Sequence, residues 1–117
     1  MASEIVVFVT CGTRREANRL ARALLHLKLA ACVNIFPSPI HSVYRWKEKI
    51  ETANEILLLI KSTRSHFREL EREIRRHHSY EVPEIIALPV VSGSEPYLRW
   101  IKQSVRPARK AVRSKHR

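Results

Sequence analysis

The segment E-I-V-V-F-V-T at residues 4–10 and the helix signal that follows it decide the fold class. The segment is a β-branched apolar run without polar alternation, as expected of a strand that is covered on both faces. Thr13 and Glu16 then form a T-x-x-E capping box, in which the Glu16 carboxylate is expected to close back onto the Thr13 amide. Apolar residues at helical spacing predict a helix over residues 14–28. The chain therefore begins with a buried strand that leads into an amphipathic helix.

Further along the chain, the sequence predicts three more strands and two more helices. A long second strand covers residues 31–46 with an interruption at Pro37-Ser38-Pro39, and a hairpin tip follows at residues 47–49. The third strand covers residues 56–60 and the fourth covers residues 82–91. One helix carries Phe67, Leu70 and Ile74 on one face, and a capping box of Ser92 and Glu95 opens another that runs to Val105.

The order β-α-β-β-α-β-α predicts an α+β domain with the ferredoxin-like split βαβ fold. Right-handed crossovers give an antiparallel sheet with the strand order 4-1-3-2. Proline cannot donate to a ladder, and the in-strand prolines fall in the second and fourth strands, which are the expected edges. The second strand is long, aromatic and apolar, so its unpaired edge favours association of several copies into a closed ring.

Length and composition exclude several classes of protein. A chain of 117 residues is one domain, and its two glycines cannot form a phosphate-binding glycine loop. Aspartate is absent, which removes EF-hand loops and Asp-based triads. Apolar stretches are too short for membrane insertion, no secretory signal is visible, and the two cysteines lack a C-x-x-C spacing. We therefore expect a cytoplasmic protein with reduced thiols.

The net charge of +11 is concentrated toward the C-terminus. Residues 106–117 (R-P-A-R-K-A-V-R-S-K-H-R) are rich in lysine and arginine and contain no acid. The sequence thus predicts a single domain over residues 1–105 and a flexible basic tail over residues 106–117. Attraction of nucleic acid or anionic lipid to this tail is the functional alternative to a solvated terminus.

Cys11 and the neighbouring histidines His77 and His78 are expected to meet at one end of the sheet, because the first and fourth strands are neighbours. Cys11 precedes a helix N-terminus, whose dipole favours the thiolate. A thiolate and imidazoles suit copper or zinc better than magnesium or calcium. A small buried cysteine beside two solvated helix-end histidines is the structural alternative. Cys32 begins the second strand at the opposite end, so a Cys11–Cys32 disulfide is not expected.

Two other functions of this fold find little support in the sequence. An RNA-recognition motif needs aromatic residues on its central strands, and residues 5–9 and 55–61 contain only Phe8. A metallochaperone needs two closely spaced cysteines after the first strand, where Cys11 stands alone. No nucleophile–base pair with an orienting acid is visible either, so we expect a protein that is not an enzyme.

Several strings in the chain resemble the CutA divalent-cation-tolerance family, and the resemblance covers about residues 4–105. They are V-T-C-G at 9–12, L-A-A-C-V-N at 29–34, Y-R-W at 44–46, L-L-L-I-K at 57–61 and H-S-Y-E-V-P-E-I-I-A-L-P-V at 78–90. The resemblance implies a homotrimer that binds copper or another divalent metal ion and takes part in metal tolerance. It also implies that Cys11, His77 and His78 are the metal residues, with His78 the better match to the family position. Ser79 stands where the family usually has proline, and Glu48 where it usually has glycine.

A second function remains open for the same fold. A trimeric ligand-binding or signalling module would use a cleft between subunits for a small anion or metabolite. The residues expected in this intersubunit pocket are Tyr44, Trp46, Lys61, Glu81 and Glu84. A third possibility is a nucleic-acid-associated protein that acts through the basic tail.

Overall fold

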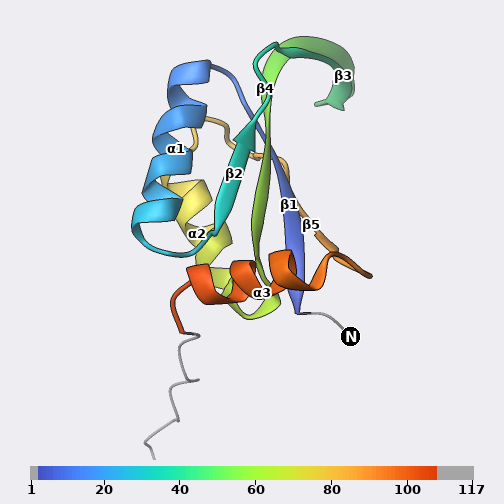
Figure 1. Ribbon diagram of the computed structural model, residues 1–117. Helices are drawn as coiled ribbons and strands as arrows, with labels where there is room; N and C mark the ends of the chain where they lie inside the picture. The colour runs from blue at the N-terminus through green and yellow to red at the C-terminus, as the bar shows by residue number, and fades with distance from the viewer. Residues whose placement is uncertain (1–2, 108–117) are drawn as a thin grey trace, which may run out of the picture.

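The computed structural model describes residues 3–107, which form an α+β fold of five strands and three α-helices (Figure 1). Along the chain these are β1 (Glu4–Cys11), α1 (Arg14–His26), β2 (Cys32–Ile35), β3 (Ile40–Trp46), β4 (Lys49–Thr63), the short 3-10 helix η1 (Arg64–His66), α2 (Phe67–His77), β5 (Ile85–Pro89) and α3 (Glu95–Ser104). The α+β class expected from the sequence is confirmed.

β4 is the longest strand and organises the sheet. Its inner half lies between β1 and β2, and β5 pairs with the other side of β1, which gives the order β2-β4-β1-β5. Its outer half pairs with β3 alone, from Ile40 opposite Glu55 to Trp46 opposite Lys49. All pairings are antiparallel. In Figure 1 the β3–β4 hairpin curves away from the layer formed by the helices.

Three strand boundaries differ from the sequence-based expectation. The expected second strand is divided into β2 and β3, because the two prolines between them lack the N–H groups that a ladder needs. The third strand extends well beyond residues 56–60 in both directions, because its polar N-terminal end pairs with β3 and its polar C-terminal end pairs with β1. The fourth is shorter than residues 82–91, and only Ile85–Pro89 is a strand.

The core lies between one face of the sheet and the helices α1 and α2 (Figure 1). Alternate residues of β1 and β4 point toward the helices, and both helices present an apolar stripe to them. The fully buried side chains include Val7, Val9, Leu58, Ile60, Leu20, Leu24, Leu70 and Ile74. Each such burial stabilises the fold by roughly 1.5–3 kcal/mol. This layer fixes where β1 ends and where α1 and α2 begin and end.

The three helices are short, and α3 begins differently from expectation. None of the helices within residues 3–107 has the length and apolar character that a bilayer span requires. The expected capping box of Ser92 and Glu95 is wrong, because the N-cap residue of α3 is Ser94, whose side chain makes no capping hydrogen bond. The Ser94 carbonyl instead accepts from the Leu98 amide at 2.9 Å.

Arg106 is held against the domain on three sides. Its amide donates to the Lys28 carbonyl at 2.9 Å, and its carbonyl lies 2.6 Å from Nε2 of the buried His66. Its guanidinium forms an ion pair with Glu69. The first residue of the expected tail is therefore anchored, which the sequence-based boundary after Val105 missed. The remaining expected tail residues, 108–117, lie outside the described part of the chain.

Candidate metal centre

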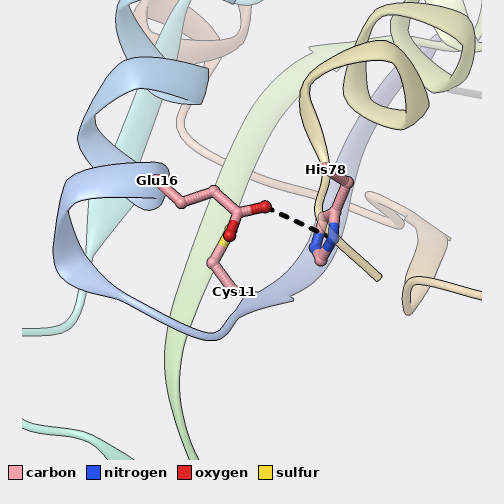
Figure 2. Close-up of side chains that lie close together, drawn as sticks. All are labelled: Cys11, Glu16 and His78. Carbon is pink, nitrogen blue, oxygen red and sulfur yellow. Dashed lines mark ion pairs between the residues drawn. The ribbon is translucent and has the colours of Figure 1, made fainter. Parts of the chain in front are cut away.

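Three polar side chains meet at one end of the sheet, where β1 ends, α1 begins and α2 ends (Figure 2). They are Cys11, the last residue of β1, Glu16 in the first turn of α1, and His78, the C-cap residue of α2. One ligand atom from each lies within 4.8 Å of the others. Cys11 and the His78 side chain are fully buried, and Glu16 is nearly so. The folding of the core layer therefore brings a thiol, a carboxylate and an imidazole together out of water.

Glu16 is positioned by contacts at both ends of its side chain. Its amide donates to the Thr13 hydroxyl at 3.1 Å, which is the first half of the expected capping box. The second half is wrong, because the carboxylate turns away from Thr13 toward Ser79. It accepts from the Ser79 amide at 2.7 Å and from the Ser79 hydroxyl at 2.9 Å. These bonds compensate the carboxylate for its loss of water.

Both ring nitrogens of His78 have partners. Nε2 lies 2.7 Å from the Thr10 carbonyl oxygen, which can only accept, so Nε2 carries a proton. The Tyr80 amide donates to Nδ1 at 3.1 Å, so Nδ1 is the lone-pair nitrogen of a neutral imidazole. Nδ1 also lies 3.5 Å from a Glu16 carboxylate oxygen. The nitrogen with the lone pair is thus the one that faces the carboxylate.

Burial raises the pKa of the Cys11 thiol to about 12. The negative charges of Glu16 and Glu55 act in the same direction, and Arg19 opposes them only in part. The expected stabilisation of the thiolate by the N-terminus of α1 is therefore wrong, since loss of hydration and two carboxylates outweigh the helix dipole. At neutral pH the thiol carries its proton.

His77 does not join this cluster. Its ring nitrogen lies 3.6 Å from Glu73 on the same helix, and its carbonyl accepts from Arg19 at 3.4 Å. The backbone explains the difference, because His77 is still helical whereas His78 is extended, with φ −94° and ψ 139°. That change of direction turns the His78 ring back toward Cys11. Of the three expected metal residues, the structure brings Cys11 and His78 together.

Glu16 is the member of the cluster that the sequence analysis missed. The capping-box pattern assigns Glu16 to a contact with Thr13 and does not indicate which face of α1 the residue lies on. Glu16 lies four residues before Leu20 and therefore on the buried stripe of α1. A glutamate on an otherwise apolar stripe, near a cysteine in the sequence, was the available signal.

A pocket of about 710 Å³ adjoins the cluster. Its lining includes four of the five residues expected in a ligand pocket, Tyr44, Trp46, Glu81 and Glu84, together with Thr10, Ser42, Val43, Glu55, Ser79, Tyr80 and Val82. Lys61 is not part of the lining. It pairs with Val6 and Cys32 further along the sheet, and its ammonium contacts Asn34.

The charge of this pocket is negative. Glu55, Glu81 and Glu84 line it, and among residues 3–107 the lining contains no lysine or arginine. Burial and then the charge of Glu55 raise the pKa of Glu84. Burial, then a hydrogen bond to Glu55 and nearby negative charges, raise the pKa of Tyr80. Within one chain, the described lining disfavours a small anion, since it presents three carboxyl groups, and leaves the expected metabolite open.

Comparison with known proteins gives a consistent result. The sequence pattern of the CutA1 divalent ion tolerance protein family matches residues 5–104. The chloroplastic protein CutA of Arabidopsis thaliana is 46% identical over 102 residues, which are 87% of this chain and 56% of that protein. The divalent-cation tolerance protein CutA of Thermus thermophilus is 41% identical over 101 residues, 86% of this chain and 97% of that protein.

The solved structures include a protein with the same arrangement of elements. The periplasmic divalent cation tolerance protein CutA from Archaeoglobus fulgidus superposes with a TM-score of 0.84 at 40% identity, covering 88% of this chain and 99% of that one. By contrast, the chain spans only about half the length of the plant and mammalian relatives that it matches.

Proposed function

The chain belongs to the CutA1 divalent ion tolerance family, and we propose that it binds copper or another soft divalent metal ion through Cys11, Glu16 and His78. In this proposal the protein is a homotrimer that acts in metal tolerance by binding and not by catalysis. The resemblance stated from the sequence motifs is thereby confirmed at the level of the family.

The observation that carries the metal site is the approach of three different donor atoms within 4.8 Å. Sulfur and imidazole nitrogen select copper and zinc over magnesium and calcium. Three ligands from the chain leave further positions for water or another donor. Glu16 and His78 are held by Ser79, Thr10 and Tyr80, so their orientation is set before a metal arrives.

Metal binding has two local costs at this site. The Cys11 thiol must lose its proton, and its pKa of about 12 makes that step unfavourable at neutral pH. The lone pair of His78 Nδ1 must exchange the Tyr80 amide for the metal. Both costs favour a reversible site that responds to metal concentration over a permanently loaded one.

The same features support a role without catalysis. A cysteine nucleophile needs access to substrate and a lowered pKa, and Cys11 has 0% exposed surface and a raised pKa. Its two neighbours, Glu16 and His78, are buried with it.

The exposed face of the sheet supports the trimer. Phe8 pairs with Leu59 and with Ile86, which places the three apolar side chains in one row across the face opposite α1 and α2. Ile86 and Leu88 are 52% and 48% exposed on β5, and Val43 on β3 is also exposed. Apolar residues collected on a sheet in this way favour burial against further copies of the chain.

Native mass spectrometry with and without copper and zinc tests the proposal, because it reports the number of subunits and of metal ions together. We expect a mass of three chains and a copper count that requires Cys11. A monomer at low micromolar concentration would contradict the assembly. Copper retained in full by Cys11→Ser would contradict the site.

The pocket lined by Tyr44, Trp46 and three glutamates supports a second candidate function, a small-ligand site. We propose that its ligand is cationic or uncharged, because of the carboxyl groups in the lining. We also propose a reducing compartment such as the cytoplasm, since Cys11 and Cys32 are both free thiols. Thermal-shift measurements with amines and with matched carboxylates test the first of these proposals. A stabilisation by carboxylates alone would overturn it.

A further inference from the structure

The outer surface of α1 and α2 carries two rows of arginines. On α1, Arg15, Arg19 and Arg22 follow at the spacing i, i+4, i+7, so they share one face of the helix. On α2, Arg68, Arg72 and Arg75 repeat the same spacing. All six are exposed. This surface, which we call the arginine face, belongs to the side of the helices that points away from the core.

The two rows lie next to each other. α1 and α2 contact one another on the same side of the sheet (Figure 1). The Arg19 guanidinium donates to the His77 carbonyl at 3.4 Å, which joins α1 to the end of α2. Neighbouring helix axes are about 8–10 Å apart, and seven residues of helix span about 10 Å. The arginine face therefore concentrates its charge in a patch roughly 10 Å across, which covers a short stretch of the roughly 34 Å turn of a duplex.

Most of this charge is not neutralised by the chain itself. Arg75 pairs with Glu71 at 3.9 Å and Arg76 with Glu73 at 3.1 Å. Within residues 3–107, Arg15, Arg22, Arg68 and Arg72 have no ion-pair partner. A pocket on the surface of α2 is lined by Arg68, Arg72, Arg75, Arg76 and a single acid, Glu71.

We infer that the arginine face binds the phosphate backbone of duplex nucleic acid without reading its sequence. Arginine presents a planar fork of donors that matches phosphate oxygens bidentately, and every cation of the two rows is arginine. The net charge of +11 would steer a polyanion toward the protein. This function is separate from the metal centre, which is buried on the other side of α1.

The composition of the face favours a duplex over the other polyanions. Single strands are held by stacking on aromatic residues, and neither row contains one. A membrane surface is held by a basic face flanked by several apolar residues that insert. Among the described residues, α2 has no exposed large apolar side chain and α1 has one, Leu25. Arginines without stacking or insertion partners are typical of contacts to a duplex backbone.

The test measures binding of the full-length protein to a short mixed-sequence DNA duplex over a range of salt concentrations. We compare the wild type with R15Q/R22Q and with R68Q/R72Q. Each free arginine that contacts a phosphate contributes about −0.9 to the slope of log K against log salt. We therefore expect each double variant to make that slope shallower by about 2 and to weaken binding to all sequences equally.

Two matched controls remove the same number of charges elsewhere. K47Q/K49Q changes the hairpin tip, and R113Q/K115Q changes the basic C-terminal segment. Both should retain the wild-type slope, and circular dichroism with copper titration should show that every variant keeps its fold and its metal site. The inference is overturned if the wild type does not bind the duplex, or if the C-terminal variant alone abolishes binding. It is also overturned if the arginine variants lose only binding to phosphatidylserine vesicles.

Discussion

Glu16 accepts hydrogen bonds from both the amide and the hydroxyl of Ser79, 63 positions later in the sequence, at 2.7 and 2.9 Å. This pair ties the first turn of α1 to the segment that follows α2. It also holds the carboxylate beside Cys11 and His78. A proline at position 79 would supply neither donor. The arrangement of this carboxylate therefore depends on a residue at position 79 that has both an amide and a hydroxyl.

Copper affinity should fall by about tenfold or more in Cys11→Ser and in His78→Ala, because each change removes a donor atom from the cluster. His77→Ala is the matched control, since His77 faces Glu73 instead. Isothermal titration of the three variants with copper makes the comparison. Equal losses in His77→Ala and His78→Ala would show that the helix end matters and the cluster does not.

The same titration should depend on pH with a defined sign. Binding releases the Cys11 proton, and the thiol pKa of about 12 lies far above neutral pH. Between about pH 6 and 8, affinity should therefore rise by about tenfold for each pH unit. In Cys11→Ser this proton is not released, so the dependence should become weaker. A steep dependence that survives in Cys11→Ser would assign the proton to another group.

The buried thiol should also shape stability in alkali. Folding raises the Cys11 pKa from 9.0 to about 12, so the unfolded chain loses this proton first as pH rises. The contribution of the protonated Cys11 thiol to the free energy of unfolding is fully present below about pH 9. It is lost between about pH 9 and 12, by at most about 1.4 kcal/mol per pH unit. Urea unfolding of the wild type and Cys11→Ala, at one protein concentration, should show a shallower decline in the variant. Identical slopes would contradict the pKa shift.

Two truncations should behave differently although they differ by two residues. Removal of residues 108–117 should leave the free energy of unfolding almost unchanged. Removal of residues 106–117 should cost about 1–3 kcal/mol, because the Lys28 carbonyl and the buried His66 ring each lose their partner in Arg106. Arg106→Ala keeps both backbone contacts and should cost less. Denaturant unfolding of the three variants checks this, and equal stability of the two truncations would mean that the Arg106 contacts contribute nothing.

The hairpin between β3 and β4 should tolerate a stabilising change. Lys47 and Glu48 both have left-handed backbone conformations, with φ of 49° and 66°. Replacing the pair with Asn-Gly, which suits a two-residue turn of this kind, should stabilise the protein by about 1 kcal/mol. Thermal unfolding measures the gain, and Asn-Ala at the same positions is the control that lacks the glycine. A larger gain with Asn-Ala than with Asn-Gly would contradict the role of the backbone.

The parts of the fold that could be predicted from the sequence are those with a local pattern. The stripe of α2 and the apolar run of β1 appear directly in the periodicity, and the structure has both elements. The outer half of β4 carries Glu51, Asn54 and Glu55, which have no strand pattern. That half is a strand because β3 folds back onto it, and pairing across a hairpin is not visible in either segment alone.

Only the part of the site that depends on the order of the strands could be predicted from the sequence. The neighbouring positions of β1 and β5 brought Cys11 and the histidines to one end of the sheet. The position of the Glu16 carboxylate could not be predicted without Ser79, because it accepts from the two Ser79 donors and not from the nearby Thr13 amide. Lys61 was expected in the pocket, yet the register puts it beside Cys32, and it is not among the lining residues.

The two halves of β4 have different surroundings, so their backbone amides should exchange with solvent at different rates. Residues 56–63 pair with β1, and residues 58–61, which include the fully buried Leu58 and Ile60, also pair with β2. Residues 49–55 pair with β3 alone, and Ile50 is 70% exposed. In a single chain, deuterium would enter the amides of residues 49–55 through brief local openings, and those of residues 56–63 only when the whole domain unfolds. The amides of one continuous strand would then exchange with two different lifetimes, and the change from one to the other would lie at Glu55.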